Sequence, residues 1–148
     1  MNKRTKTNYI VVHCAATKPS MDTSAADIDR WHRERGWLKI GYHFVVRRNG
    51  EIEEGRHIEE VGAHASGYNS GSVSVCLIGG LSEDGKTSEN NFTEEQWESF
   101  GAVIDTLTNR YPNAKVIGHN DISKKDCPTF NVGEWYAKYR SDDEYAIE

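Results

Sequence analysis

Residues 41–56 read GYHFVVRRNGEIEEGR, in which two strand-like runs stand on either side of Asn49-Gly50. An Asn-Gly pair between two such runs is the strongest short-range signal of a β-hairpin, because both residues tolerate the positive φ angles of a tight turn. The two strands of a hairpin are antiparallel, so this stretch argues against an all-parallel sheet. We therefore expect the sheet of this protein to be mixed.

Three other segments have the composition of β-strands. Residues 7–15, TNYIVVHCA, are rich in β-branched side chains and bounded by polar ones, and residues 114–118, AKVIG, form a shorter run of the same kind. Residues 73–80, VSVCLIGG, are nearly all apolar, which is typical of a central strand that is buried on both faces. The hairpin and these three segments predict the strands of the sheet.

The segment MDTSAADIDRWHRERG, residues 21–36, predicts the first helix. Ser24 and Asp27 have the spacing of a capping box, in which each residue's side chain accepts a hydrogen bond from the other's backbone N–H. Gly36 follows the last periodic position and is typical of a helix end.

A second helix begins with a stronger signal, in FTEEQW. Thr93 and Gln96 form a capping box, while Phe92 and Trp97 occupy the two positions of a hydrophobic staple. Apolar residues then recur at helical spacing until Pro112, whose ring disfavours helical geometry in the residue before it. We expect one long amphipathic helix here.

The remaining segments complete a single α/β domain. NVGEWYAKYR predicts a terminal helix whose cap is Asn131, and the chain shows no internal repeat and no linker. We expect a mixed central β-sheet flanked by helices over residues 9–140, a flexible N-terminal segment at 1–8 and a frayed acidic tail at 141–148.

The composition limits the classes of partner. A chain of 148 residues should bury roughly 68–70% of its unfolded surface, which is enough for one core in a monomer. Its net charge of −5 gives no cationic field for nucleic acid, and no apolar run is long enough for a signal peptide or a membrane span. Three cysteines cannot all pair, so we expect synthesis in a reducing cytoplasm, with neither nucleic acid nor membrane as a partner.

The three cysteines differ in their surroundings. Cys14 and Cys76 lie in apolar strand runs and are expected to be small core residues. Cys127 lies in a polar segment, close to Lys124 and Lys125. Neighbouring cations stabilise a thiolate, so we expect the Cys127 thiol to ionise more readily than a core thiol.

Two histidines stand near strand ends, where loops build sites. His119 directly follows 114–118, and His13 precedes the turn-forming ATKPS. With Cys127 they would make a three-ligand zinc set that leaves the fourth position for water, which is the arrangement of catalytic zinc. The spacing does not decide the matter, because the eight residues from His119 to Cys127 can span up to ~28 Å. Each histidine alone is equally well explained as a packed or surface residue.

Five ordered motifs resemble one known family: VHCAATKPS, GWLKIGYHFVVRRNGEIEEGR, VGAHASGYN, SVCLIGG and H-x7-CP. They look like the zinc-dependent N-acetylmuramoyl-L-alanine amidases, most of all the small phage lysozyme-type endolysins related to peptidoglycan recognition proteins. The resemblance covers about residues 9 to 140. It implies a mixed sheet flanked by helices, with the site in an open groove.

The resemblance also implies roles for individual residues. His13, His119 and Cys127 match the zinc ligands, Tyr42 matches the catalytic tyrosine and Lys125 the catalytic lysine. Relatives that bind peptidoglycan without cutting it commonly lack the cysteine, so its presence here argues for an enzyme. One departure is that many relatives read Cys-Pro-Gly where this chain reads Cys-Pro-Thr, which puts the detailed geometry of this loop in doubt.

Adjacent strand residues face opposite ways, so only one of Tyr42 and His43 is expected to reach the metal. Histidine is the usual general base, but the resemblance selects Tyr42 and leaves His43 as a packing residue. The same resemblance places His64 and Asn69 on the groove wall as candidates for substrate contact. The other candidates are weaker: His32 and His57 are expected on the surface, Asp121 as a partner of a ligand histidine or an exposed carboxylate, and Trp37 in the groove or behind the helix.

The activity implied by the resemblance is hydrolysis of the amide between N-acetylmuramic acid and L-alanine by a zinc-activated water. A phage endolysin of this kind would accumulate in the host cytoplasm and meet the cell wall at lysis. Three alternatives stay open. They are a module that binds peptidoglycan without cutting it, a protein that regulates a phage RNA polymerase through the segment MNKRTKTNY, and a thiol hydrolase that uses Cys127 with His119.

Overall fold

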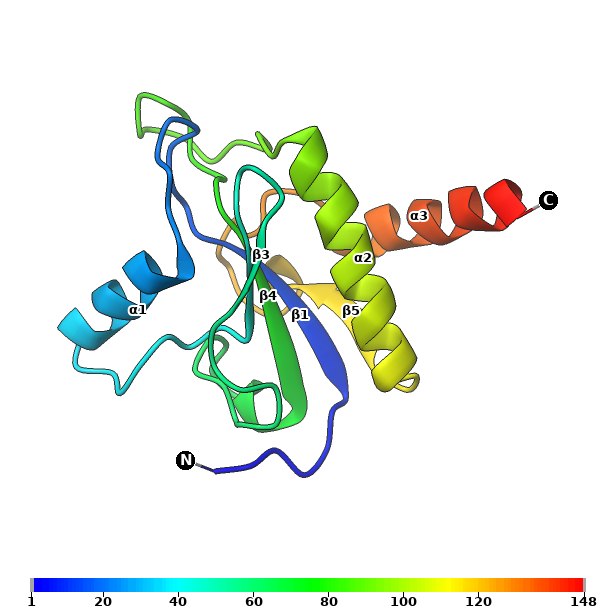
Figure 1. Ribbon diagram of the computed structural model, residues 1–148, viewed down its shortest axis with the longest axis horizontal. Helices are drawn as coiled ribbons and strands as arrows, with labels where there is room; N and C mark the ends of the chain where they lie inside the picture. Colours follow the sequence, from blue (N-terminus) through cyan, green and yellow to red (C-terminus); the bar gives the residue numbers. More distant parts are fainter. Residues whose placement is uncertain (1, 148) are drawn as a thin grey trace.

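A five-stranded sheet lies at the centre of the computed structural model, which describes residues 2–147 and their side chains through residue 141 (Figure 1). The strand order is β3-β2-β4-β1-β5, and every neighbouring pair is parallel except β2 and β3. The prediction of a single α/β domain with a mixed sheet is confirmed. The strands are β1 (Tyr9–Cys14), β2 (Phe44–Val46), β3 (Ile52–Glu54), β4 (Ser72–Leu77) and β5 (Lys115–Gly118).

The predicted hairpin joins β2 to β3. Its turn is closed by two backbone hydrogen bonds, from Arg47 N–H to the Glu51 carbonyl and from Gly50 N–H to the Arg47 carbonyl, both 2.8 Å long. Gly50 has a φ of 88°, a left-handed value that glycine adopts without steric cost. The Asn49 side-chain oxygen accepts the Glu51 N–H at 2.9 Å. The Asn-Gly pair therefore stabilises the turn in two ways. The Asn49 side chain accepts a backbone hydrogen bond, and Gly50 adopts the left-handed conformation.

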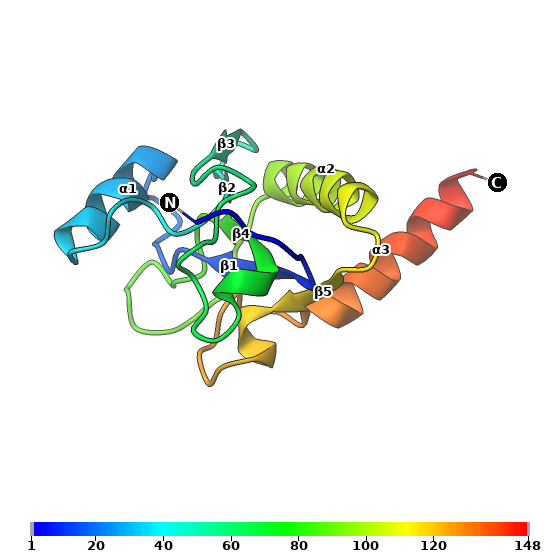
Figure 2. The ribbon, with the colours of Figure 1, turned by 90° about the horizontal axis from the view of Figure 1, so that it is seen from below.

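One face of the sheet is covered by α2 (Glu94–Arg110) (Figure 2), and Val132 at the start of α3 (Val132–Ile147) joins the same core. Alternate residues of the strands form this face, because successive side chains of a strand point to opposite sides. They make the larger core together with the buried residues of α2. The strand residues are Ile10, Val12, Cys14, Val46, Val73, Val75, Leu77 and Val116, and those of α2 are Phe100, Val103, Ile104 and Leu107.

The opposite face carries a smaller core and an unusual number of buried polar groups. Ile28 of α1 (Ala25–Glu34) packs there with Val45, Cys76 and other apolar side chains. The polar residues of this side that are almost fully buried are His13, His32, His43, Ser72 and Ser74. Buried polar side chains need hydrogen-bond partners, so this face is where a functional site is to be sought.

The three helices begin where the sequence predicts. Ser24 and Asp27 make the reciprocal bonds of a capping box, and so do Thr93 and Gln96. The Phe92 and Trp97 rings, 5.8 Å apart between centroids, form the predicted staple. The side-chain oxygen of Asn131 accepts the Glu134 N–H at 2.9 Å, which caps α3.

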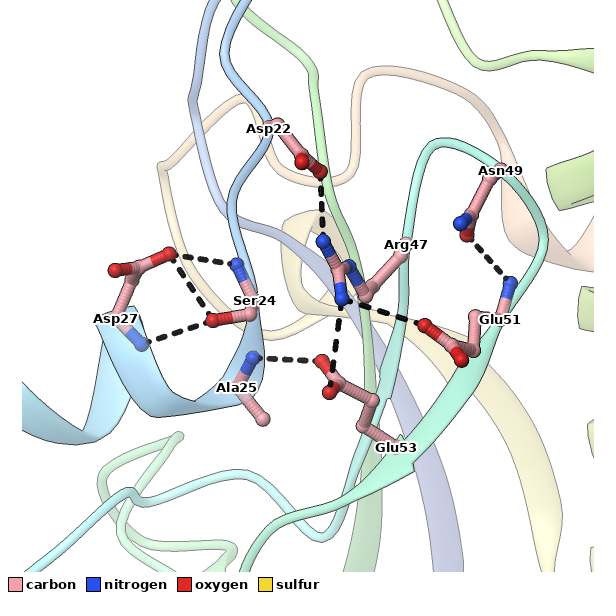
Figure 3. A network of polar contacts seen from close by, with 8 residues as sticks. All are labelled: Asp22, Ser24, Ala25, Asp27, Arg47, Asn49, Glu51 and Glu53. Carbon is pink, nitrogen blue, oxygen red and sulfur yellow. Dashed lines mark hydrogen bonds and ion pairs between the residues drawn. The ribbon is translucent and has the colours of Figure 1, made fainter.

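The hairpin is tied to the start of α1 by the charged network in Figure 3. The Arg47 guanidinium lies 2.7 Å from Asp22 and 3.3 Å from Glu51, and it also reaches Glu53 at 3.9 Å. Glu53 in turn accepts the N–H of Ala25 at 2.9 Å, and so satisfies one of the free donors at the start of α1. These contacts fix α1 beside the β2–β3 end of the sheet.

The two chain ends carry features that the sequence did not predict. The flexibility of the segment 1–8 stays a prediction, and within its described residues Arg4 donates to the Ile58 carbonyl at 2.6 Å and to the Tyr111 hydroxyl at 3.0 Å. The helix α3 was expected to end near residue 140, but it continues to Ile147 through most of the predicted frayed tail. Met1 and Glu148 lie outside the described residues. No helix within residues 2–147 combines the length and the apolar character needed to cross a membrane.

Candidate metal centre and its cavity

The carboxyl ends of β1 and β5 bring two histidines side by side. Val12 of β1 is paired with Gly118 of β5 in the parallel ladder, so His13 and His119 follow at the same level. Their rings are 4.5 Å apart between centroids. Sites in open α/β sheets form outside the carboxyl ends of parallel strands, and this pair follows that rule.

A folded-back loop carries Cys127 to the same place. The side chain of Asp121 accepts the Gly118 N–H at 2.8 Å and closes the short 3-10 helix η2 (His119–Asp121). The Asn120 N–H then donates to the carbonyl of Cys127 itself at 2.7 Å. Asp121, a candidate partner for a ligand histidine, thus holds the turn that starts this loop.

The donor atoms of His13, His119 and Cys127 all lie within 4.8 Å of one another. Tetrahedral zinc with bonds of about 2.0–2.3 Å places its ligand atoms roughly 3.3–3.7 Å apart, so small side-chain rotations would close this set around an ion. Two imidazoles and a thiol are also the donor types that zinc prefers. Among residues 2–141, whose side chains the structure describes, no other grouping of three or more such side chains meets this spacing. The residues present therefore fit a zinc ion.

The surroundings of Cys127 act on its thiol in opposite directions. The pKa of Cys127 is raised, first by its contact with the Cys14 thiol and then by burial, and burial also raises the pKa of the core thiol of Cys76. The expectation that Cys127 ionises more readily than a core thiol therefore stays a prediction. One contact favours the thiolate, because the Cys14 backbone N–H points at the Cys127 sulfur from 3.1 Å. The thiol is therefore a group that a metal ion must deprotonate as it binds.

These three residues stand at the wall of a cavity of about 300 Å³. Tyr42 faces His13 across it, with ring centroids 5.0 Å apart, and Lys125 lines its mouth with an exposed side chain. Burial raises the pKa of Tyr42 well above its ordinary value, so the phenol stays protonated and can donate a hydrogen bond. A larger hollow of about 560 Å³, beside Arg4 and Tyr111, contains none of the predicted site residues.

Tyr42 and His43 point in different directions, as their adjacency predicts. His43 is fully buried away from the cavity. Its Nδ1 accepts the Ser74 backbone N–H at 3.0 Å, and its Nε2 lies 2.8 Å from the Glu60 carbonyl oxygen, to which it donates. His43 is a packing residue, and Tyr42 is the member of the pair that reaches the site.

Six of the seven predicted site residues line the cavity, and Asn69 does not. The Asn69 side-chain oxygen accepts the backbone N–H groups of His64 and Ala65 at 2.8 and 2.9 Å. His64 does line the cavity, but its Nδ1 lies 2.9 Å from His13 and its Nε2 lies 3.1 Å from Ser72. Substrate contact by His64 and Asn69 stays a prediction, and the geometry gives both residues bonds within the protein.

The sequence analysis missed His32 and left Trp37 undecided. His32 was expected on the surface, but it is 6% exposed, lines the cavity and accepts the Gly41 N–H on Nδ1 at 3.0 Å. The Trp37 ring lies 4.4 Å from the His32 ring and also lines the cavity. A signal was present, because His32 stands four residues after the buried Ile28 on the same helical face. His57 is exposed, as expected.

Comparison with known proteins places this geometry in a family. The family model described as N-acetylmuramoyl-L-alanine amidase matches residues 3–130. The chain is 45% identical over 133 residues to an endolysin of Enterobacteria phage K11, and the aligned region covers 90% of this chain and 87% of the phage protein. It is 43% identical over 136 residues to an endolysin of Escherichia phage T7, with 92% and 89% covered.

A solved structure shows the same likeness in three dimensions. The N-acetylmuramoyl-L-alanine amidase LysC from Clostridium intestinale URNW aligns with a TM-score of 0.77 and 29% identity, over 94% of this chain and 86% of that one. The family match contains all five strands and the whole segment from His13 to Cys127. The chain belongs to the N-acetylmuramoyl-L-alanine amidase family.

Proposed function

We propose that the protein hydrolyses the amide bond between N-acetylmuramic acid and L-alanine in peptidoglycan, and that His13, His119 and Cys127 hold the zinc ion that this reaction needs. One observation carries the proposal. Three zinc-type donors from distant parts of the chain meet within 4.8 Å at the wall of a cavity that also contains Tyr42 and Lys125. Membership of the amidase family supports the choice of bond.

When bound, zinc would supply an acidified water as nucleophile and would polarise the carbonyl of the amide. The ligand set contains one sulfur, which as a thiolate leaves the centre with less positive charge than three neutral ligands would. A cation close to the cavity compensates for that loss. Lys125 is this cation, and no carboxylate among the described side chains of residues 2–141 forms an ion pair with it.

Lys125 and Tyr42 have complementary roles in the proposal. The Lys125 ammonium stabilises the negative charge that develops on the amide oxygen, a contribution of about 3–4 kcal/mol when one such donor is lost. The Tyr42 phenol, kept protonated by burial, donates a hydrogen bond to the reacting group. The ring of Trp37, 40% exposed at the rim, offers an apolar surface to the sugar or the peptide stem.

The relatives support a proposal for the biological setting. Two proteins to which this chain is similar over about nine tenths of both lengths are phage endolysins. We propose the same setting here, in which a monomeric enzyme is made in the host cytoplasm and acts on the cell wall when the membrane is breached.

The test is digestion of purified sacculi with and without a zinc chelator. The expected result is the release of new alanine amino groups without new reducing sugar ends, together with loss of activity on chelation and recovery on adding zinc. Activity that survives chelation would favour the thiol hydrolase. Binding to sacculi without release of amino groups would favour a module that only recognises peptidoglycan.

Two variants with matched controls separate the roles. Lys125→Ala should keep zinc and lose about 100- to 1,000-fold in rate, whereas Lys124→Ala, the exposed neighbour outside the cavity, should keep both.

Cys127→Ala should lose zinc and turnover together. His57→Ala, which removes an exposed histidine, should lose neither. Full activity in Lys125→Ala or in Cys127→Ala contradicts the role assigned to that residue.

A further inference from the structure

We propose that His64 and Ser72 form a hydrogen-bond chain that fixes the tautomer and the orientation of His13, so that His64 is a positioning residue for a metal ligand. This inference rests on the proposed function, since it concerns how the protein orients a ligand of the same metal centre. In this proposal His64 acts through His13 and not by contact with substrate.

The chain has three links that follow one another in space. His13 Nε2 lies 2.9 Å from His64 Nδ1, and His64 Nε2 lies 3.1 Å from Ser72 Oγ. The Ser72 hydroxyl also lies 2.7 Å from the carbonyl oxygen of Tyr68. The chain therefore runs from the metal-facing histidine to a backbone carbonyl.

The carbonyl at its end gives the chain a direction. A carbonyl oxygen only accepts, so the Ser72 hydroxyl donates its single hydrogen to the Tyr68 carbonyl. The Ser72 oxygen must then accept a hydrogen bond from His64 Nε2. A neutral imidazole has one donor and one acceptor, so His64 Nδ1 is then an acceptor and His13 Nε2 is the donor. The lone pair of His13 is consequently on Nδ1, the ring atom left free for a metal ion.

A histidine that binds a metal ion is neutral, and His13 is one of the three donors that meet here. A neutral His64 is the form that can accept from His13 at Nδ1 and donate to Ser72 at Nε2. With the carbonyl fixed at the far end, only one assignment of donors and acceptors then satisfies every link.

The surroundings hold His64 in this position. The Asn69 side-chain oxygen binds the backbone N–H of His64 at 2.8 Å. Gly62 leaves room for the ring, because a Cβ atom there would lie 2.8 Å from His64 Cδ2 and 2.9 Å from His43 Cε1. Ser72 is fully buried in β4. The fold thus fixes each member of the chain without any contribution from a ligand.

The first test measures zinc binding, by competition with a chromophoric chelator, in the full-length protein. His64→Leu removes the acceptor, and we expect the zinc dissociation constant to rise about 10- to 100-fold, as is typical for loss of a group that orients a ligand. His64→Asn places an amide oxygen near the position of Nδ1 and should recover part of the affinity. Ser72→Ala, which breaks the second link only, should weaken zinc binding less than His64→Leu.

A residue that only contacts substrate would behave differently. His64→Leu would then raise KM and leave the zinc dissociation constant unchanged, and that result overturns the proposal. Equal zinc affinity in His64→Leu and His64→Asn, both weakened, would show that the acceptor is not what matters, and it overturns the proposal as well.

A second measurement needs neither zinc nor a variant. Long-range ¹H–¹⁵N correlation spectra of the metal-free protein distinguish the two tautomers of a neutral histidine. We expect the Nε2–H tautomer for both His13 and His64, and an Nδ1–H tautomer at either residue overturns the proposal. Because this readout involves no metal, it stays decisive even if the protein fails to bind zinc, a result that would count against the proposed function alone.

Discussion

Thr129 is the residue at which this chain departs from the Cys-Pro-Gly pattern that the resemblance implies. Its φ is +83°, in the left-handed region that favours glycine and that a β-branched side chain rarely adopts. Its hydroxyl oxygen is also buried and has no hydrogen-bond partner within the described part of the chain. The loop therefore keeps a backbone suited to glycine and accommodates threonine at some cost in stability.

Replacing Thr129 with glycine should accordingly stabilise the protein. Relief of the left-handed strain and of the unpaired hydroxyl is worth about 2 kcal/mol, and the greater freedom of glycine in the unfolded chain returns about half of it. We expect the free energy of unfolding in urea to rise by about 1 kcal/mol in Thr129→Gly. The control is Thr87→Gly, at an exposed loop position without positive φ, which should lower stability. A loss of stability in Thr129→Gly would contradict the inference that the backbone of Thr129 is strained.

Residue types alone did not indicate the roles of the histidines. His64 could not be told from a surface histidine by its neighbours in the sequence, because its partners lie far along the chain, whereas His32 does stand at helical spacing from the buried Ile28. His64 meets His13 from 51 residues away. The raised pKa of Cys127 depends in the same way on a distant residue, because its largest cause is the contact with Cys14, 113 residues earlier.

At the scale of elements, the features predicted best are those that depend on neighbouring residues. The capping boxes, the staple and the Asn-Gly turn each involve residues within five positions, and all are present. The order and register of the strands could not be predicted, because they depend on pairings such as His13 with Cys76 that no local pattern encodes. The length of α3 was also missed, since the polar tail gave no helix signal beyond residue 140.

Gln96 shows how a local cap also serves the whole sheet. Its side-chain oxygen accepts the Thr93 N–H at 3.0 Å, as the capping box predicts. Its amide nitrogen donates to the carbonyls of Val46 and Ile78, at 3.1 and 2.8 Å. The side chain is fully buried, so it joins the start of α2 to the ends of β2 and β4 inside the core.

Replacing Gln96 with leucine should therefore be costly. The substitution keeps the volume but leaves buried backbone groups with fewer partners, and we expect the free energy of unfolding to fall by about 2–3 kcal/mol. The measurement is urea denaturation followed by circular dichroism. Glu98→Leu, at an exposed position of the same helix, should change stability by no more than about 0.5 kcal/mol. Equal effects of the two substitutions would show that helix propensity, and not the buried bonds, decides the cost.

At the scale of the whole molecule, the two faces of the sheet have different functions. The face under α2 is apolar and provides the main core, while the other face carries buried histidines and serines that lead to the cavity. Resemblance of motifs predicts which residues bind a metal, but only the fold shows that these residues meet. It also shows that several titratable groups are held neutral inside the protein, which makes global stability depend on pH.

His43 allows this dependence on pH to be measured at a residue that is not one of the proposed metal ligands. Burial lowers its pKa to about 4, with smaller effects of Arg4 and Arg56, whereas an unfolded histidine titrates near ~6.5. Its Nδ1 faces the Ser74 N–H, so a proton there would meet another donor. Below pH ~6.5 the unfolded chain binds the proton and the folded one does not, so stability falls as the pH falls toward 4.

Between pH 7 and pH 5 the contribution of His43 amounts to about 2 kcal/mol. Unfolding in urea at several pH values should show that His43→Gln loses about 2 kcal/mol less than the unsubstituted protein over this interval, whatever its stability at pH 7. His57→Gln should follow the unsubstituted protein, because His57 is exposed. Since the other buried histidines remain in both variants, the difference between the two slopes isolates His43. Parallel slopes would mean that His43 is protonated in the folded protein and that its bond from Ser74 is not maintained.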